Sequence, residues 1–158
     1  MNTLGVKREE EARRKQPHAT TTVMVVEDFD ETRYMLKLVM ELCGYRVVEA
    51  INGQQAVEVA RRERPDLILM DLGLPVMDGC KATRLIREDQ ALRKVPILAV
   101  SANATAEYRV KALAAGCNEY VTKPIDFDYL KALINHFLQQ TDNAEDDGPT
   151  LTLQHSND

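Results

Sequence analysis

The chain has 158 residues, of which 44% are hydrophobic, and a formal net charge of −5. This length and composition predict one globular domain with a sizeable core rather than a disordered chain. No apolar run approaches the roughly 20 residues of a membrane helix, and the polar N-terminus lacks the apolar region of a signal peptide. Acidity and scattered basic residues argue against nucleic-acid binding. We therefore expect a cytoplasmic protein that binds neither membranes nor nucleic acid.

Apolar runs and amphipathic stretches alternate along the chain in a βα order that is repeated five times. Strands are predicted at residues 22–26, 46–50, 66–70, 97–100 and 118–121, and helices at residues 30–43, 54–63, 79–89 and 106–115 and after Pro124. Stop signals end or separate these segments at Gly44, Pro65 and Gly116, and capping acids are expected at Asp30, Asp78 and Asp126.

Two helices have apolar residues at helical spacing that predict their buried sides. In the first helix these are Tyr34, Leu36, Leu38, Val39 and Leu42. In the last helix they are Phe127, Leu130, Leu133, Ile134, Phe137 and Leu138. The three cysteines, Cys43, Cys80 and Cys117, are odd in number and predict reduced thiols that pack in the core rather than bind metal.

The near-continuous apolar strands indicate a parallel sheet with helices on both faces. Right-handed crossovers then favour an α/β doubly wound fold of the flavodoxin-like kind, with five strands in the order 2-1-3-4-5. The folded domain is expected over residues 20–140. Residues 1–19 are predicted to be a polar arm, and residues 141–158 an acidic, disordered tail.

Polar residues end four of the predicted strands. Glu27 and Asp28 follow the first strand, Asp71 follows the third, Ser101 follows the fourth and Lys123 follows the fifth. The carboxyl ends of parallel strands meet at one edge of a sheet, where open α/β sheets bind their ligands. Three acids, a hydroxyl and an ammonium predict an oxygen-rich metal site beside a phosphoryl site.

Each residue type has a chemical reason to be in such a site. A carboxylate such as Asp71 can accept a phosphoryl group, and Mg²⁺ prefers oxygen ligands. Lys123 supplies a positive charge and Ser101 a hydrogen bond for phosphoryl oxygens. Without cations, three neighbouring acids are expected to raise at least one pKa. Taken singly, these residues also fit plainer roles, such as helix caps, a turn acid and a surface amine.

Four segments together resemble the receiver domain of two-component response regulators, over residues 21–140. They are residues 25–28 (VVED), 70–79 (MDLGLPVMDG), 100–102 (VSA) and 120–124 (YVTKP). The resemblance implies that Asp71 accepts a phosphoryl group from a phosphohistidine on a histidine kinase or a histidine phosphotransfer protein. It implies a Mg²⁺ site at Glu27, Asp28, Asp71 and the Gly73 carbonyl, with Lys123 and Ser101 assisting at the phosphoryl group.

The same resemblance implies a switch and an output surface. Ser101 and Tyr120 are expected to form the switch pair, which remodels the surface of the fourth helix, the fifth strand and the fifth helix. A plainer possibility for Tyr120 is a half-buried core aromatic with its hydroxyl in water. A cis bond between Lys123 and Pro124 is also expected. Gly73 and Asn103 occupy positions that vary in the family and influence dephosphorylation.

Three functions fit the sequence to different degrees. The leading one is a single-domain response regulator that signals by protein contacts, as a monomer or a phosphorylation-dependent dimer. It is not an enzyme beyond promoting its own phosphorylation and dephosphorylation, and residues 141–158 are too few for an output domain. The second is a phosphorylation-independent interaction module with the receiver fold. The third, a metal-dependent phosphatase with an aspartyl nucleophile, is disfavoured because Gly73 stands where a second Asp is expected.

Overall fold

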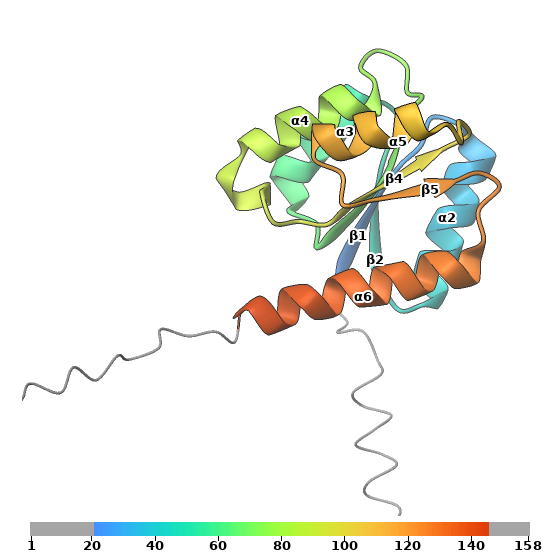
Figure 1. Cartoon of the computed structure of the whole chain (residues 1–158). Coiled ribbons are helices and arrows are strands. Elements are labelled where there is room, and N and C mark those ends of the chain that lie inside the picture. The colour runs from blue at the N-terminus through green and yellow to red at the C-terminus, as the bar shows by residue number, and fades with distance from the viewer. Residues whose placement is uncertain (1–20, 146–158) are drawn as a thin grey trace, which may run out of the picture.

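The computed structural model describes residues 21–145, which form one five-stranded parallel sheet with helices on both faces (Figure 1). The strand order is β2-β1-β3-β4-β5, so the predicted flavodoxin-like topology is confirmed. The strands are β1 (Thr22–Val26), β2 (Arg46–Ala50), β3 (Leu67–Asp71), β4 (Ile97–Ser101) and β5 (Glu119–Thr122). The helices are α2 (Asp30–Leu42), α3 (Gly53–Glu63), α4 (Gly79–Glu88), the short 3₁₀ helix η1 (Gln90–Leu92), α5 (Ala106–Ala115) and α6 (Phe127–Glu145).

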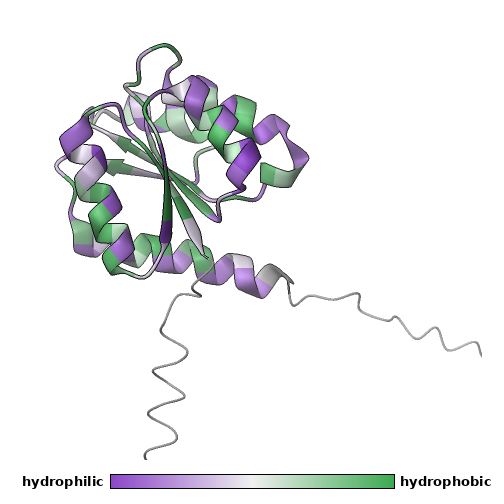
Figure 2. Ribbon diagram, turned by 180° about the vertical axis from the view of Figure 1, so that it is seen from behind, coloured by the Kyte–Doolittle hydropathy of each residue, from purple (hydrophilic) through white to green (hydrophobic). Residues whose placement is uncertain are grey.

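Alternate residues of the strands build two cores, one on each face of the sheet. Met24 and Met70 lie in a core that is completed by residues of α3, α4 and α5. Val25 and Leu69 lie in the opposite core, completed by residues of α2 and α6. Every residue of β1, β3 and β4 is buried, as expected for the centre of a parallel sheet that is covered on both faces, and most of the strand ribbon is hydrophobic whereas the helices are mixed (Figure 2).

Strands β3 and β4 each end one residue later than the sequence predicts, and this affects the site. Asp71 pairs with Val100 and Ser101 pairs with Thr122, so both residues still belong to the sheet. Helix α6 also continues through residues 141–145, which the sequence assigns to the tail, and the 3₁₀ helix η1 was not predicted. The predicted arm and residues 146–158 lie outside the described residues. Within residues 21–145, no helix is long and apolar enough to cross a membrane.

Most predicted caps and buried positions are confirmed, but helix α2 differs. Asp78 caps α4 and Asp126 accepts bonds at the start of α6, whereas Asp30 is the first residue of α2 and its cap position, Phe29, makes no side-chain cap. The buried residues of α2 are Leu36 and Met40, one stripe at i and i+4. Three residues predicted to be buried lie on another stripe and are exposed, namely Tyr34, Leu38 and Leu42.

All three cysteines are free and pack against the two cores, as predicted.

Candidate functional site

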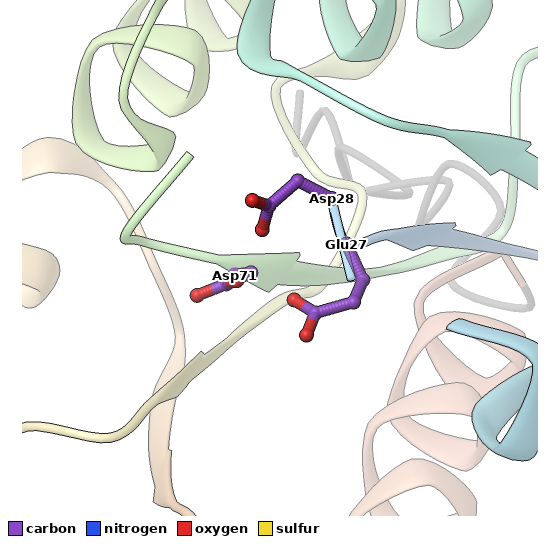
Figure 3. A group of neighbouring side chains, drawn as sticks. All are labelled: Glu27, Asp28 and Asp71. Carbon is purple, nitrogen blue, oxygen red and sulfur yellow. The ribbon is translucent and has the colours of Figure 1, made fainter. Parts of the chain in front are cut away.

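Three carboxylates converge where β1 and β3 end. Glu27 and Asp28 follow β1, and Asp71 is the last residue of the neighbouring β3. One oxygen atom from each carboxylate lies within 4.8 Å of the other two (Figure 3). Glu27 and Asp71 are only 2% and 7% exposed, while Asp28 is exposed. The predicted meeting of these acids is therefore present in the structure.

The donor atoms of this cluster suit a hard cation. All are carboxylate oxygens, which are the ligands that Mg²⁺ and Ca²⁺ prefer. Oε2 of Glu27 is buried and has no hydrogen-bond partner among the described residues. A buried oxygen without a partner is costly, and a bound cation would satisfy it. Glu27, Asp28 and Asp71 could therefore hold a divalent cation.

Lys123 provides the positive charge of the site. Its Nζ lies 3.0 Å from Oε1 of Glu27 and 3.5 Å from Oδ2 of Asp71. The peptide bond between Lys123 and Pro124 is cis, as the family resemblance predicts. Burial alone would lower the pKa of Lys123, but the contacts with Glu27 and Asp71 outweigh it and raise the pKa. Lys123 is therefore held in its charged form beside the acids.

Glu27 has the most perturbed carboxyl group among the described residues. Burial, and then the proximity of Asp71, raise its pKa from 4.5 to about 8, although Lys123 acts in the opposite direction. This agrees with the prediction that three neighbouring acids raise at least one pKa. A cation that binds here must therefore displace a proton from Glu27 near neutral pH.

Two glycines allow the loop after Asp71 to pack closely. A Cβ atom at Gly79 would lie 2.2 Å from the main-chain oxygen of Asp71, so α4 can begin this close to β3 only with glycine. A Cβ atom at Gly53 would lie 2.1 Å from the main-chain oxygen of Met77, which accepts a hydrogen bond from the Gly53 N–H. The N–H of Gly73 donates to Oδ1 of Asp71 at 3.1 Å. The role of the Gly73 carbonyl as a ligand stays a prediction.

Ser101 and Tyr120 contact the same loop, residues 102–105, rather than the acids. The Ser101 Oγ accepts a hydrogen bond from the N–H of Asn103 at 3.1 Å. The Tyr120 hydroxyl donates to the main-chain oxygen of Asn103, and the tyrosine is only 6% exposed. The plainer possibility of a half-buried Tyr120 with its hydroxyl in water is therefore wrong, because the hydroxyl reaches a carbonyl group inside the protein.

A cavity of about 530 Å³ opens over the phosphoacceptor candidate. Asp71, Ser101 and Lys123 line it together with Arg84 and Lys111 from helices α4 and α5. Three predicted residues from three different strand ends therefore share one solvent-accessible space. The cavity gives a small phosphorylated molecule or a side chain of a partner access to Asp71.

Arg33 belongs to the surroundings of the site but was not identified from the sequence. Its Nη1 donates to the main-chain oxygen of Glu27 at 3.0 Å, and its Nη2 lies 2.6 Å from Oδ1 of Asp30. The i, i+3 spacing of Asp30 and Arg33 was a signal for the ion pair. The bond to the Glu27 carbonyl depends on the turn between β1 and α2, which the sequence pattern does not show.

A doubly wound sheet with an acidic cluster and a lysine at its switch point suits phosphoryl chemistry, because ligands bind at this point and a carboxylate can accept a phosphoryl group. The family model described as "Response regulator receiver domain" matches residues 23–135. The chain belongs to this family, whose members are signalling domains of two-component systems.

Similar proteins and structures agree with this assignment. The chain is 35% identical over 117 residues to the "Polar-differentiation response regulator DivK" of Brucella anthropi, which covers 74% of this chain and 95% of the relative. It is 38% identical to the receiver domain of sensor histidine kinase PA1611 from Pseudomonas aeruginosa PAO1, a structure with a magnesium ion coordinated in its active-site cleft. That match covers 76% of this chain and 98% of the other, with a TM-score of 0.72. A response regulator from Chloroflexus aurantiacus, described as putative, is 28% identical with a TM-score of 0.73, over 76% of this chain and 98% of the other.

Proposed function

We propose that this protein accepts a phosphoryl group on Asp71 from a phosphohistidine of a histidine kinase or a histidine phosphotransfer protein. The observation that carries the proposal is the convergence of Glu27, Asp28 and Asp71 within 4.8 Å, with Lys123 beside two of them. Phosphoryl transfer depends on positioning and on charge neutralisation, and this cluster offers both. The protein acts as a cytoplasmic signalling domain, not as an enzyme on other substrates.

Mg²⁺ is the cofactor that this donor set fits. Glu27, Asp28, Asp71 and the Gly73 carbonyl are the proposed ligands, and the PA1611 receiver domain holds magnesium in the corresponding cleft. The ion neutralises negative charge on the incoming phosphoryl group. Lys123 holds a second positive charge at Asp71, and Ser101 is the hydroxyl in the same cavity that can donate to a phosphoryl oxygen.

The partner that donates the phosphoryl group must cover the surface beside Asp71. A hollow of about 410 Å³ lies next to Lys123, between the start of α2 and the start of α6. Phe29 and Met35 line it and are 58% and 48% exposed. Exposed apolar residues beside a reactive group mark a docking surface. The phosphodonor is proposed to dock there.

The output surface is proposed to be the face of α5, β5 and α6. A hollow of about 500 Å³ lies on this face and is lined by residues of all three elements, including Tyr120. Of the ten residues of α5, only Ala112 and Ala115 are buried, so little packing opposes a movement of this helix. A change at Ser101 can reach this face through the loop that Tyr120 contacts.

Intact mass spectrometry tests the phosphoacceptor. Wild-type protein incubated with acetyl phosphate and Mg²⁺ should gain one labile phosphoryl group, and the Asp71→Asn variant should gain none. Labelling of Asp71→Asn to the wild-type level would move the phosphoacceptor to another residue. Omitting Mg²⁺, or using Asp28→Ala, should abolish labelling, while Glu27→Ala should weaken it less.

A second candidate function is a receiver fold that presents its output face independently of phosphorylation. The inward position of Tyr120, with its hydroxyl bound to the Asn103 carbonyl, favours it because the switch residue needs no further movement to be buried. A beryllofluoride titration separates the two functions. A phosphorylatable receiver binds the complex at Asp71 in the presence of Mg²⁺, and an inert module does not.

A further inference from the structure

Arg33, on the first turn of α2, makes three polar contacts with its guanidinium group. Nη1 donates to the main-chain oxygen of Glu27 at 3.0 Å, Nη2 lies 2.6 Å from Oδ1 of Asp30, and Nε lies 3.4 Å from Oε1 of Glu49. The side chain is only 16% exposed. A guanidinium group is planar and rigid, so three partners in different directions fix its position.

The carbonyl group that Arg33 binds belongs to the peptide that joins Glu27 to Asp28. The N–H of Glu27 donates to the main-chain oxygen of Ala50 in β2 at 3.1 Å. The backbone of Glu27 is therefore held on one side by the sheet and on the other by Arg33. Because this peptide connects two of the three acids, its orientation decides whether both carboxylates face Asp71.

The charges around Arg33 are balanced. An isolated guanidinium group near a divalent cation would repel that cation. Here Asp30 and Glu49 both contact the guanidinium group and compensate its charge. Arg33 can therefore donate to the Glu27 carbonyl without making the site repulsive to a cation.

We infer that Arg33 is a positioning residue for the divalent-cation site: it holds the Glu27–Asp28 peptide so that both carboxylates face Asp71. This inference rests on the proposed Mg²⁺ site. Arg33 does not itself contact the ion. A plain structural role, in which Arg33 only ties α2 to β2 through Glu49, predicts a change in stability but none in Mg²⁺ affinity.

The test is a calorimetric titration of the full chain with Mg²⁺ alone. The Arg33→Met variant keeps the length and apolar part of the side chain, and it should bind Mg²⁺ roughly 10-fold more weakly than wild type, as is typical when a residue that orients metal ligands is removed. The Arg33→Lys variant keeps the charge but cannot contact three partners, so its affinity for Mg²⁺ should lie between those of wild type and Arg33→Met. Because Arg33→Lys is conservative, it keeps the test valid if Arg33→Met fails to fold.

Lys37 offers a matched control. It lies one turn further along α2 and its Nζ is 3.4 Å from Oε2 of the same Glu49, but it has no contact with Glu27 among the described residues. Lys37→Met should keep wild-type Mg²⁺ affinity. A loss in Lys37→Met equal to that in Arg33→Met would show that only the charge of the helix matters, and this would overturn the inference.

A second measurement separates positioning from general damage. The rate of Asp71 labelling by acetyl phosphate is followed as a function of Mg²⁺ concentration. Arg33→Met should need more Mg²⁺ for half the maximal rate but should approach the wild-type rate at saturation. If Arg33→Met binds Mg²⁺ as wild type does, Arg33 has no positioning role, whereas if wild type itself binds no Mg²⁺, the proposed function is wrong.

Discussion

The Tyr120 hydroxyl donates a hydrogen bond to the main-chain oxygen of Asn103, and so ties β5 to the loop that follows β4. The same loop residue donates its N–H to Ser101, the last residue of β4. Asn103 therefore connects the two side chains that the family resemblance pairs as a switch. Movement of Ser101 towards Asp71 would change the position of the carbonyl group that Tyr120 binds.

Replacing Tyr120 by Phe removes this bond and keeps the ring. We expect the free energy of unfolding to fall by about 1 kcal/mol, because a partly buried hydrogen bond is lost. Hydrogen exchange in residues 102–105 should become faster, while labelling of Asp71 by acetyl phosphate continues. Tyr45→Phe is the control, since its hydroxyl binds Asn135 at 3.2 Å far from this loop. Equal exchange in both variants would show that Tyr120 does not hold the loop.

The raised pKa of Glu27 predicts how stability depends on pH in metal-free buffer. The unfolded chain releases this proton near pH 4.5, but the folded protein keeps it until about pH 8. Protonated Glu27 therefore contributes fully to the free energy of unfolding below pH 4.5. This contribution decreases as the pH rises to 8, by at most about 1.4 kcal/mol per pH unit. Glu27→Gln should lack this loss. Urea unfolding of wild type and Glu27→Gln from pH 4.5 to 8.5 tests this prediction. If the free energy of unfolding depends on pH in the same way in both proteins, the pKa of Glu27 is not raised.

Much of the fold and the site could be predicted because the signals are local. The apolar strands, Gly44, Gly116 and the caps at Asp78 and Asp126 each reflect short-range backbone preferences, and the strand ends place Glu27, Asp28, Asp71 and Lys123 at one edge. The pairing of Ser101 and Tyr120 as a switch came from the resemblance. It stays a proposal, as do the Mg²⁺ ligand role of the Gly73 carbonyl and the hydrogen bond from Ser101 to a phosphoryl group.

The features that were missed depend on tertiary contacts. Tyr34 and Leu42 have helical spacing but lie on the outer side of α2, because only the stripe of Leu36 and Met40 faces the sheet. The contact of Arg33 with the Glu27 carbonyl depends on the conformation of a turn. Helix α6 continues beyond residue 140, past its apolar stripe. The sequence assigned residues 141–145 to a polar tail because their composition is polar.

Val76 is a strained residue in the loop after Asp71. Its φ angle is 68°, in the left-handed region, and its side chain is 79% exposed. A β-branched residue is unfavourable there, whereas Asn adopts this conformation more readily. Val76→Asn should therefore raise the free energy of unfolding by about 1 kcal/mol, measured by urea denaturation. Val110→Asn, at a 66% exposed position in helix α5, should give no such gain. If Val76→Asn also leaves the free energy of unfolding unchanged, the backbone at Val76 is not strained.

The last prediction concerns the route from the site to the output face. A phosphoryl group adds roughly −1.5 to −2 charges near neutral pH, which Lys123 and a bound cation balance while the Ser101 hydroxyl can donate to it. Ser101→Ala should still be labelled at Asp71, because the hydroxyl is not the acceptor. Beryllofluoride with Mg²⁺ should alter hydrogen exchange across residues 101–123 in wild type and much less in Ser101→Ala. The difference should be largest in α5, where only Ala112 and Ala115 anchor the helix to the core. A ligand shifts a conformational equilibrium only through contacts that differ between the two states, and the Ser101 hydroxyl is the contact proposed to differ. If exchange changes only around Asp71 in both proteins, the α5–β5–α6 face is not the output surface and the protein acts as a carrier of the phosphoryl group.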